Sequence, residues 1–358
     1  MLTPVPNTGA LQLPFSVAAM AAALQLIPNT YGLVRDLNLF PSETVGSTIV
    51  QLDAEDGLIY ALPAEPRGAP ATPGTTVTRS TIYAELAHVP HKDVILAADV
   101  QNVRQLASNS LESATNWMLN RLERYTRPRH DVTREVMRVG ALKGLVLDGA
   151  GQEVINLYTT FGVTQKIIPF DLDNAASDII GKCQEIWDHI AANIRGSGFA
   201  GVEVVVGGTF FNKLIQHPKV ADLYKSYEAA QQIANAVRAQ NQAYGRQFLF
   251  QGIMFREYNW MYSGWDPATN RPTTSTTRFV ATDRGHAYPT GTTNLMATFD
   301  GPPNTMDMVN TAPPSGDYIH ITEEVLDHGA GVEVLSQSNL LPICRQPVIL
   351  IELRAGAS

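Results

Sequence analysis

The residues best suited to chemistry lie in one short stretch, where His88 and His91 flank Pro90 and are followed by Asp93. Two imidazoles and a carboxylate are ligands that zinc accepts. Three further histidines could complete such a set: His286, His320 and His328. Histidine pairs bind metal when a helix or turn holds both nitrogens on one side, but Pro90 interrupts this pair at the end of a predicted β arm. We therefore interpret the stretch as a surface strand end and keep a metal-dependent hydrolase as an alternative.

A second candidate is Val206-Gly207-Gly208-Thr209, which follows an apolar run and opens a helical pattern. Glycine turns at helix N-termini bind phosphate, but a nucleotide loop has a fuller glycine spacing and a Lys-Ser/Thr pair. The tetrapeptide therefore predicts a tight turn with a threonine cap. The sequence has no Gly-x-Ser-x-Gly elbow, so no nucleophile of that type is indicated. We expect no enzyme, no catalytic or metal residue and no cofactor.

The composition excludes further classes. The 358 residues carry a net charge of −8, whereas a dedicated nucleic-acid binder clusters Lys and Arg. Only 17% of the residues are charged, which fits a protein whose surface is largely covered by neighbours. Cys183 lies on the apolar face of a helical pattern and Cys344 in an apolar run, which predicts two buried thiols.

The N-terminal segment carries no targeting signal that we recognise. Residues 15–27 are apolar, but no Lys or Arg precedes Arg35, and a signal peptide needs a basic start. The stretch between Pro14 and Pro28 is also shorter than the roughly 20 residues of a membrane span. Two interpretations remain open, a short helix of an arm that lies on another surface and an ordinary first helix. We expect no membrane association.

The next segment predicts an extended β hairpin. Residues 47–52 and 57–62 are strand-like around an acidic turn at 53–56, residues 63–74 form a Pro/Gly-rich tip, and a Thr-rich arm follows from residue 75 to 88. An isolated two-stranded hairpin is at best marginally stable in water. The hairpin therefore needs a surface to lie on, which points to a partner subunit.

The remainder predicts a mixture of helices and strands. Apolar residues at helical spacing indicate a helix at 111–125 and a second one that begins at an Asp131 cap after Pro128, with Arg134 and Arg138 off its apolar face, and ends at Gly144. A hairpin is expected at 145–158, helices at 179–194 and 209–240, and a buried strand at 202–206. Further strands are expected at 247–258, 278–281, 318–324, 331–335 and 347–353, with a polar loop at 267–277.

Four motifs carry a resemblance to a known family. Residues 29–40 (NTYGLVRDLNLF) resemble its arm segment, and residues 140–144 (GALKG) resemble the end of its spine helix. Residues 278–282 (RFVAT), followed by Gly285, resemble a strand and turn of its axial domain, and residues 336–342 (SQSNLLP) with 348–353 resemble its closing Ser-rich turn and final strand. In this order the motifs resemble the phage lambda major head protein family, also called major capsid protein E.

The resemblance implies an α+β fold, the phage capsid fold of the Hong Kong ninety-seven type. It implies an N-terminal arm at 1–45, an extended loop at 46–98, a peripheral domain with a spine helix at 99–165 and 318–358, and an axial domain at 166–317. It further implies hexamers and pentamers of this chain in an icosahedral shell around double-stranded DNA. An encapsulin-like compartment is the alternative within the same architecture.

The resemblance also implies partners and a location. A short arm leaves no room for a fused scaffold, so a separate scaffolding protein is expected, together with a portal, a decoration protein of the kind common in the family, and non-specific contact with packaged DNA. The protein would be assembled in the host bacterial cytoplasm and reside in the virion. The predicted inter-subunit contacts are charges of the extended loop: Asp53, Glu55, Asp56, Glu65, Arg67 and Arg79.

Overall fold

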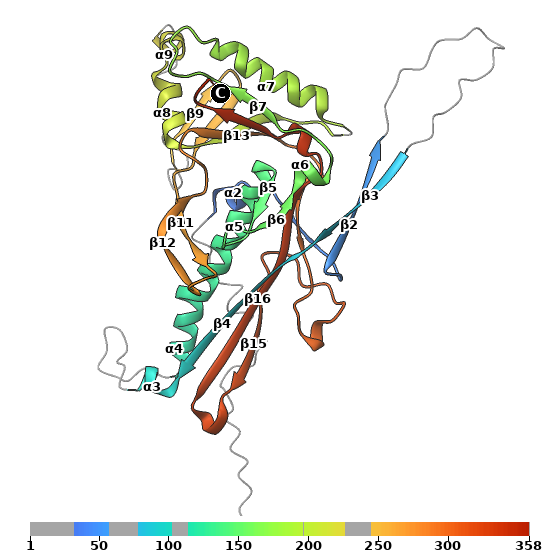
Figure 1. Cartoon of the computed structure of the whole chain (residues 1–358), viewed down its shortest axis with the longest axis vertical. Helices are drawn as coiled ribbons and strands as arrows, with labels where there is room; N and C mark the ends of the chain where they lie inside the picture. Colours follow the sequence, from blue (N-terminus) through green and yellow to red (C-terminus); the bar gives the residue numbers. More distant parts are fainter. Residues whose placement is uncertain (1–31, 57–77, 102–113, 196, 226–244, 358) are drawn as a thin grey trace, which may run out of the picture.

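The computed structural model describes residues 32–56, 78–101, 114–195, 197–225 and 245–357. These residues form an elongated body with one sheet at each end and a hairpin that projects from the middle (Figure 1). A long helical run connects the two ends. No helix in the described part of the chain is both long and apolar enough to span a bilayer.

A six-stranded sheet occupies one end, with strand order β7-β17-β13-β8-β10-β9. Its strands are β7 (Lys166–Pro169), β8 (Gly201–Val206), β9 (Gln247–Phe250), β10 (Ile253–Glu257), β13 (Arg284–Thr290) and β17 (Ile351–Arg354). Val202, Val204 and Val206 face one hydrophobic cluster, whereas Val205 belongs to another. Strand β8 is therefore buried on both sides, as its continuous apolar run predicted.

Helices α7 (Ile179–Asn193), α8 (Gly208–Gln216) and α9 (Pro218–Lys225) accompany this sheet. Helix α7 begins where the Asp178 carboxylate accepts the Gly181 N–H at 3.1 Å, an N-terminal cap. It buries Cys183 and Ile186 with other apolar residues at helical spacing. Cys183 and Cys344 are both buried and unbonded to each other, which confirms the two predicted thiols.

The second sheet has five strands: β1 (Ser42–Thr44), β4 (Ala87–Leu96), β14 (Met296–Asp300), β15 (His320–Val325) and β16 (Gly331–Cys344). Strand β16 pairs with β4 along one edge and with β14 and then β15 along the other. Residues 336–342, expected as a Ser-rich turn, lie inside β16, so that expectation was wrong. Pairing with β4, β14 and β15 decides their conformation, against their turn-like composition.

The helical run consists of α4 (Ala114–Arg121), the π-helix η1 (Leu122–Thr126) and α5 (Arg127–Lys143). The predicted break at Pro128 with a cap at Asp131 was wrong, because α5 runs through both residues. Proline is tolerated in the first turn of a helix, and the preceding π turn already interrupts the regular hydrogen-bond ladder. The predicted end at Gly144 is confirmed, with φ +80°.

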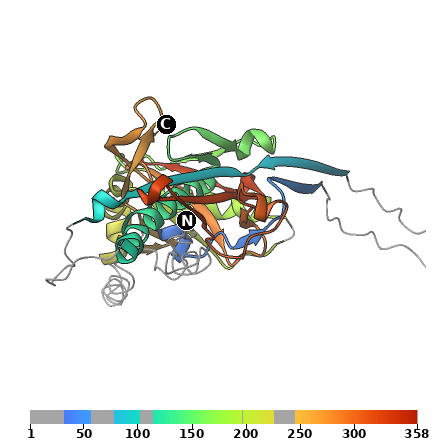
Figure 2. The same cartoon turned by 90° about the horizontal axis from the view of Figure 1, so that it is seen from below.

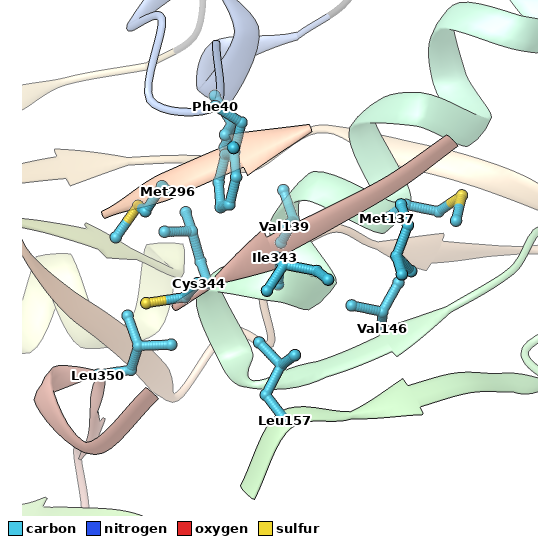
Figure 3. Close-up of a cluster of buried hydrophobic side chains, with 14 of the residues drawn as sticks. Phe40, Met137, Val139, Val146, Leu157, Met296, Ile343, Cys344 and Leu350 are labelled. Atoms are coloured by element: carbon cyan, nitrogen blue, oxygen red, sulfur yellow. The ribbon is translucent and has the colours of Figure 1, made fainter. Parts of the chain in front are cut away.

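Helix α5 packs through Met137 and Val139 into a core that includes Leu157, Ile343 and Cys344 (Figure 3). Just beyond the helix, strands β5 (Leu145–Leu147) and β6 (Glu153–Asn156) form the predicted hairpin, and the short α6 (Leu157–Thr160) follows. A Cβ on Gly144 would lie 2.2 Å from Tyr158 Cε2. Both its left-handed backbone and this close approach require glycine.

The projecting hairpin consists of β2 (Ile49–Asp56) and β3 (Thr78–Glu85), paired from Ile49↔Glu85 to Asp56↔Thr78. The predicted hairpin is confirmed in these strands, but residues 53–56 are part of β2 and not a turn. A complementary Thr-rich strand opposite them outweighs their turn propensity. Residues 57–77, with the predicted tip, lie outside the described part, as does the helical pattern at 15–27.

A second ribbon corrects another expectation. Residues 267–277, expected as a loop, mostly belong to β12 (Arg271–Arg278), which pairs with β11 (Met261–Asp266). Its threonines are β-branched and suit a strand. Residues 279–281 follow β12 instead of forming a strand of their own, and 347–349 form a short 3-10 turn before β17.

The predicted domain boundaries stay a prediction. Strand β17 belongs to the six-stranded sheet although it lies in 318–358, and β14 belongs to the five-stranded sheet although it lies in 166–317. The remaining short elements are α2 (Leu33–Asp36), α3 (Ala97–Val100), η2 (Met306–Met308), η3 (Asp327–Gly329) and η4 (Pro347–Ile349).

Truncating Leu157, which has no exposed surface, tests the shared core. Leu157→Ala should lower the free energy of unfolding by about 2–5 kcal/mol, because it removes buried methyl groups and leaves a cavity. The matched control is Leu249→Ala, at a side chain that is 41% exposed, which should cost less than about 0.5 kcal/mol. Urea unfolding followed by tryptophan fluorescence compares the two, and similar losses would contradict the assignment of the core.

Candidate subunit-contact surface

The hairpin β2–β3 is anchored in the body at its base. Val50, Ala84 and Leu86 are buried in the body, and the Leu86 N–H donates to Thr48 O at 2.9 Å. Beyond this base the two strands extend past the body, as Figure 2 shows. Among the described residues no third strand pairs with them.

The outward face of the hairpin base carries two exposed apolar side chains. Ile49 is 52% exposed and Tyr83 is 68% exposed. The register places Ile49 opposite Glu85 and Tyr83 opposite Gln51, so all four side chains lie on one face because alternate residues of a strand point the same way. Large apolar side chains on a two-stranded ribbon are typical of a surface that another molecule covers.

The six charges predicted as contact residues fall into two groups. Asp53, Glu55 and Asp56 lie in β2, and Glu55 pairs with Arg79 of β3 in the backbone register. Glu65 and Arg67 lie outside the described residues. The backbone therefore brings opposite charges into register on the hairpin, while their contacts with a neighbour stay a prediction.

A loop between β14 and β15 adds a second apolar feature that sequence reasoning missed. Met306 is 92% exposed and Val309 is 55% exposed. Met306 begins the one-turn helix η2 and Val309 follows it directly. This helix protrudes from the body on the hairpin side (Figure 1). Single apolar residues in a Pro-rich loop leave no periodicity, so the sequence carried no signal for them.

A buried ionic network holds the segments around the hairpin base. Arg134 of α5 contacts Asp300 of β14 at 3.0 Å and Asp317 at 3.5 Å. Arg138 pairs with the same Asp317, and Arg35 of α2 reaches it at 3.0 Å. Three guanidinium groups thus share one carboxylate, and the arm, the long helix and the loop before β15 meet there.

Three further hydrogen bonds extend this network. The Val34 N–H donates to Glu135 Oε1 at 2.9 Å, and the Tyr258 hydroxyl donates to the same oxygen at 3.1 Å. The Ser42 hydroxyl donates to Asp300 Oδ2 at 2.6 Å. Strand β1, from which the chain enters the hairpin, is thereby connected to the ionic network.

The network decides the charge states of its carboxylates. Burial raises the pKa of Asp317, but Arg138, Arg134 and Arg35 outweigh it and lower that pKa to about 2. Burial dominates at Asp300 and Glu135 and raises the pKa of each. A buried charge without its partner is strongly destabilising, so Asp317 must stay ionised and paired.

Sequence reasoning missed these residues because it placed Arg134 and Arg138 off the apolar face of their helix. Both are buried, since α5 lies between packed layers and has little free surface. One signal was present. Arg127, Asp131, Arg134 and Arg138 follow the spacing i, i+4, i+7, i+11 of a single helix face.

The side chains that the metal-dependent alternative would use do not converge. Strand alternation places His88 on the face of β4 opposite His91 and Asp93. Asp93 instead accepts two hydrogen bonds from Arg121, at 2.7 and 2.8 Å, and His91 Nε2 contacts Arg129 at 2.7 Å. No cluster of three potential ligands occurs in the described part of the chain.

The glycine turn is a packing feature. Gly207 precedes α8 without a side-chain cap, so the predicted threonine cap was wrong. A Cβ on Gly207 would lie 2.1 Å from Ala281 O, and one on Gly208 would lie 2.7 Å from Asn259 Oδ1. Glycine at both positions allows other segments of the same chain to approach the backbone closely.

His130 forms a second buried polar group beside the network. Its two ring nitrogens lie 2.9 Å from the hydroxyls of Ser338 and Ser336. Burial, followed by the charge of Arg134, lowers the pKa of His130 to about 3. The neutral ring thus joins α5 to β16.

The comparisons with known proteins agree on one kind of protein. A sequence profile described as phage major capsid protein E matches residues 16–355. The major capsid protein of Salmonella phage Felix O1 is 30% identical over 96% of this chain and 97% of its own length, and that of Pseudomonas phage KPP10 is 27% identical over 99% and 100%. The subunit of the bacteriophage PhiM1 mature capsid has a similar fold, with a TM-score of 0.50 and 13% identity over 88% of this chain and 84% of that one.

Removing the shared carboxylate should be costly. Asp317→Ala removes the carboxylate partner of Arg138 and Arg35 and one of the two partners of Arg134, and it should lower the free energy of unfolding by about 3–5 kcal/mol. The control Asp327→Ala removes a carboxylate from an exposed position and should change it by less than about 0.5 kcal/mol. Chemical denaturation of both variants decides, and equal stabilities would contradict a central role for the network.

His130 predicts an acid-sensitive stability. Its pKa in the folded chain, about 3, lies below the unfolded value of 6.5, so the unfolded chain binds the proton first and stability falls as pH drops below 6.5. Each pH unit within this window costs about 1.4 kcal/mol per histidine. Between pH 6.5 and 5, the free energy of unfolding of His130→Gln should therefore fall by about 2 kcal/mol less than that of the unchanged chain. Urea titrations at both pH values measure this, and identical losses would contradict it.

Proposed function

Because the chain belongs to the phage major capsid protein E family and is a structural subunit of a phage head and not an enzyme, we propose that it assembles as hexamers and pentamers. These capsomers build an icosahedral shell of the Hong Kong ninety-seven type that encloses double-stranded DNA. The observation that carries this proposal is the hairpin β2–β3, which extends past its own body and exposes the apolar side chains of Ile49 and Tyr83.

The hairpin lies over an adjacent copy of the chain. A two-stranded ribbon is at best marginally stable alone, and Val50, Ala84 and Leu86 at its base are buried in its own subunit. Fully burying an exposed apolar side chain contributes about 1.5–3 kcal/mol, and Ile49 and Tyr83, which are partly covered already, contribute less. Many such contacts, each weak enough to be reversed, become strong together when the shell closes.

The charges of the hairpin set the register of this contact more than its strength. Asp53, Glu55, Asp56 and Arg79 lie along β2 and β3, where a neighbour's complementary charges can select one alignment. Glu65 and Arg67 extend the same role toward the tip. A misaligned neighbour would face like charges and dissociate.

The domain division supports capsomer formation. The axial part, 166–317, contributes most of the six-stranded sheet and surrounds the capsomer centre, with β17 completing that sheet. The peripheral part, 99–165 and 318–358, contains the long helix and β16, with β4 and β14 completing its sheet. Residues 1–45 form the arm and 46–98 the extended loop.

Assembly needs further proteins. A separate scaffolding protein directs the curvature of the shell, a portal occupies one vertex, and a decoration protein binds outside. The packaged DNA is contacted without sequence preference. Assembly takes place in the host bacterial cytoplasm, and the product is part of the virion.

Polar substitutions on the hairpin should separate folding from assembly. Ile49→Ser with Tyr83→Ser changes only exposed side chains and should alter the free energy of unfolding by less than about 1 kcal/mol in total. Loss of both apolar contacts from every subunit should abolish closed shells, as counted by negative-stain microscopy of the full chain produced with its head proteins. The matched control, Ile49→Val with Tyr83→Phe, keeps the apolar surface and should assemble normally.

Deleting residues 65–74 tests the hairpin more severely. Circular dichroism should show that the body remains folded. Closed shells should be absent because the arm no longer reaches its neighbour. Normal particles from this variant would refute the role of the hairpin.

A further inference from the structure

We propose that the exposed face of the α4–η1–α5 helix lines the inside of the shell and binds the phosphate backbone of packaged DNA through Arg124, Tyr125 and Arg129. This inference rests on the proposed function, since it requires a shell around DNA. It assigns the otherwise unplaced DNA contact to a defined surface.

The local charge is opposite to that of the whole chain. Residues 117–130 contain Arg121, Arg124, Arg127 and Arg129 against the single carboxylate Glu123, in a chain with a net charge of −8. Arg127 is buried and pairs with Asp131. The other three arginines are exposed or partly exposed and form what we call the arginine face.

Tyr125 lies at the centre of the arginine face and is 51% exposed. The guanidinium carbons of Arg121 and Arg129 each lie 5.9 Å from its ring centroid. Cations over an aromatic ring are held by its quadrupole, so the ring restrains both arginines. Pre-ordered guanidinium groups suit phosphate, which they bind with two parallel hydrogen bonds.

The second partner of each arginine decides where positive charge remains. Arg121 is neutralised by Asp93 through two hydrogen bonds. Arg129 instead contacts a ring nitrogen of His91, a partner whose pKa is lowered by burial and by Arg129 itself. A neutral imidazole orients Arg129 without cancelling its charge, which therefore remains available to an anion.

The other side of the same domain carries two glutamates and one lysine. Glu324 and Glu333 are paired across β15 and β16 and lie on the sheet face opposite the buried Val334. Lys92 on this face is already paired with Glu333, at 2.6 Å, and Glu324 is exposed. A wall with DNA on one side only would place its cationic surface inward and its acidic surface outward.

The dimensions fit a duplex. Arg124 and Arg129 are separated by five positions, or about 7.5 Å along a helix. Over that distance a DNA duplex presents about four phosphate charges. The arginine face offers charge without an array of side chains that could read base edges, which predicts contact independent of sequence.

The first test measures the salt dependence of binding. The unassembled full-length chain is titrated against a fluorescein-labelled DNA duplex of arbitrary sequence at several salt concentrations. Arg124→Gln with Arg129→Gln should reduce the slope of log K against log salt by about 1.8, since each lost phosphate contact contributes about 0.9. The control, Lys92→Gln with Arg271→Gln, removes two exposed cations elsewhere and should leave the slope unchanged. Equal slopes for all three proteins, or an equal loss in the control, would overturn the inference.

The second test asks which way the face points. In closed shells, Arg124→Cys should be protected from a bulky polyethylene-glycol maleimide because it faces inward, and Glu324→Cys should react because it faces outward. The two native cysteines are buried and should not react. The reverse pattern overturns the inference. So does a double variant that loses affinity for an acidic scaffolding protein but keeps its affinity for DNA. Absence of shells from the unchanged chain would instead refute the proposed function, whatever the DNA titration gives.

Discussion

The ion pairs between Asp317 and three arginines are the interaction on which the arrangement of the subunit depends. One carboxylate receives Arg35 from the arm and both Arg134 and Arg138 from the long helix, while Arg134 also binds Asp300. Charged groups lose solvation energy when they are buried, and apolar residues of similar volume do not. Such a cluster therefore contributes specificity of arrangement more than stability. It defines one relative position for segments that are more than 250 residues apart in sequence.

That position determines where the hairpin leaves the body. Strand β1 precedes the hairpin, lies in parallel with β14, and is connected through Ser42 to Asp300. A hairpin that must meet a neighbouring subunit has to emerge in the same direction from every copy. Errors of direction would be multiplied around a closed shell, whereas the strength of each contact need not be high.

Periodicity and backbone requirements were readable from the sequence, and tertiary context was not. The buried face of α7 follows from helical spacing, and the double burial of β8 follows from its continuous apolar run. The end of α5 at Gly144 follows from the positive φ that glycine allows. Residues 53–56 and 336–342 have turn-like compositions but are strands, because paired partners distant in sequence override local propensity. Arg134 and Arg138 look like solvent-facing charges until the layers around α5 are known. The family itself was recognisable from the order of weak motifs, which no single residue carried.

The junction between β3 and β4 has a mechanical consequence. Only Leu86 separates the two strands, which follow nearly one line through the subunit (Figure 1). Strand β4 is bonded to β16 along ten residue pairs, from Gly331↔Leu96 to Leu340↔Ala87. Tension on the arm therefore acts lengthwise on that ladder and strains its rungs together in shear, instead of peeling them apart one by one. A head under outward pressure would be loaded along its most resistant direction.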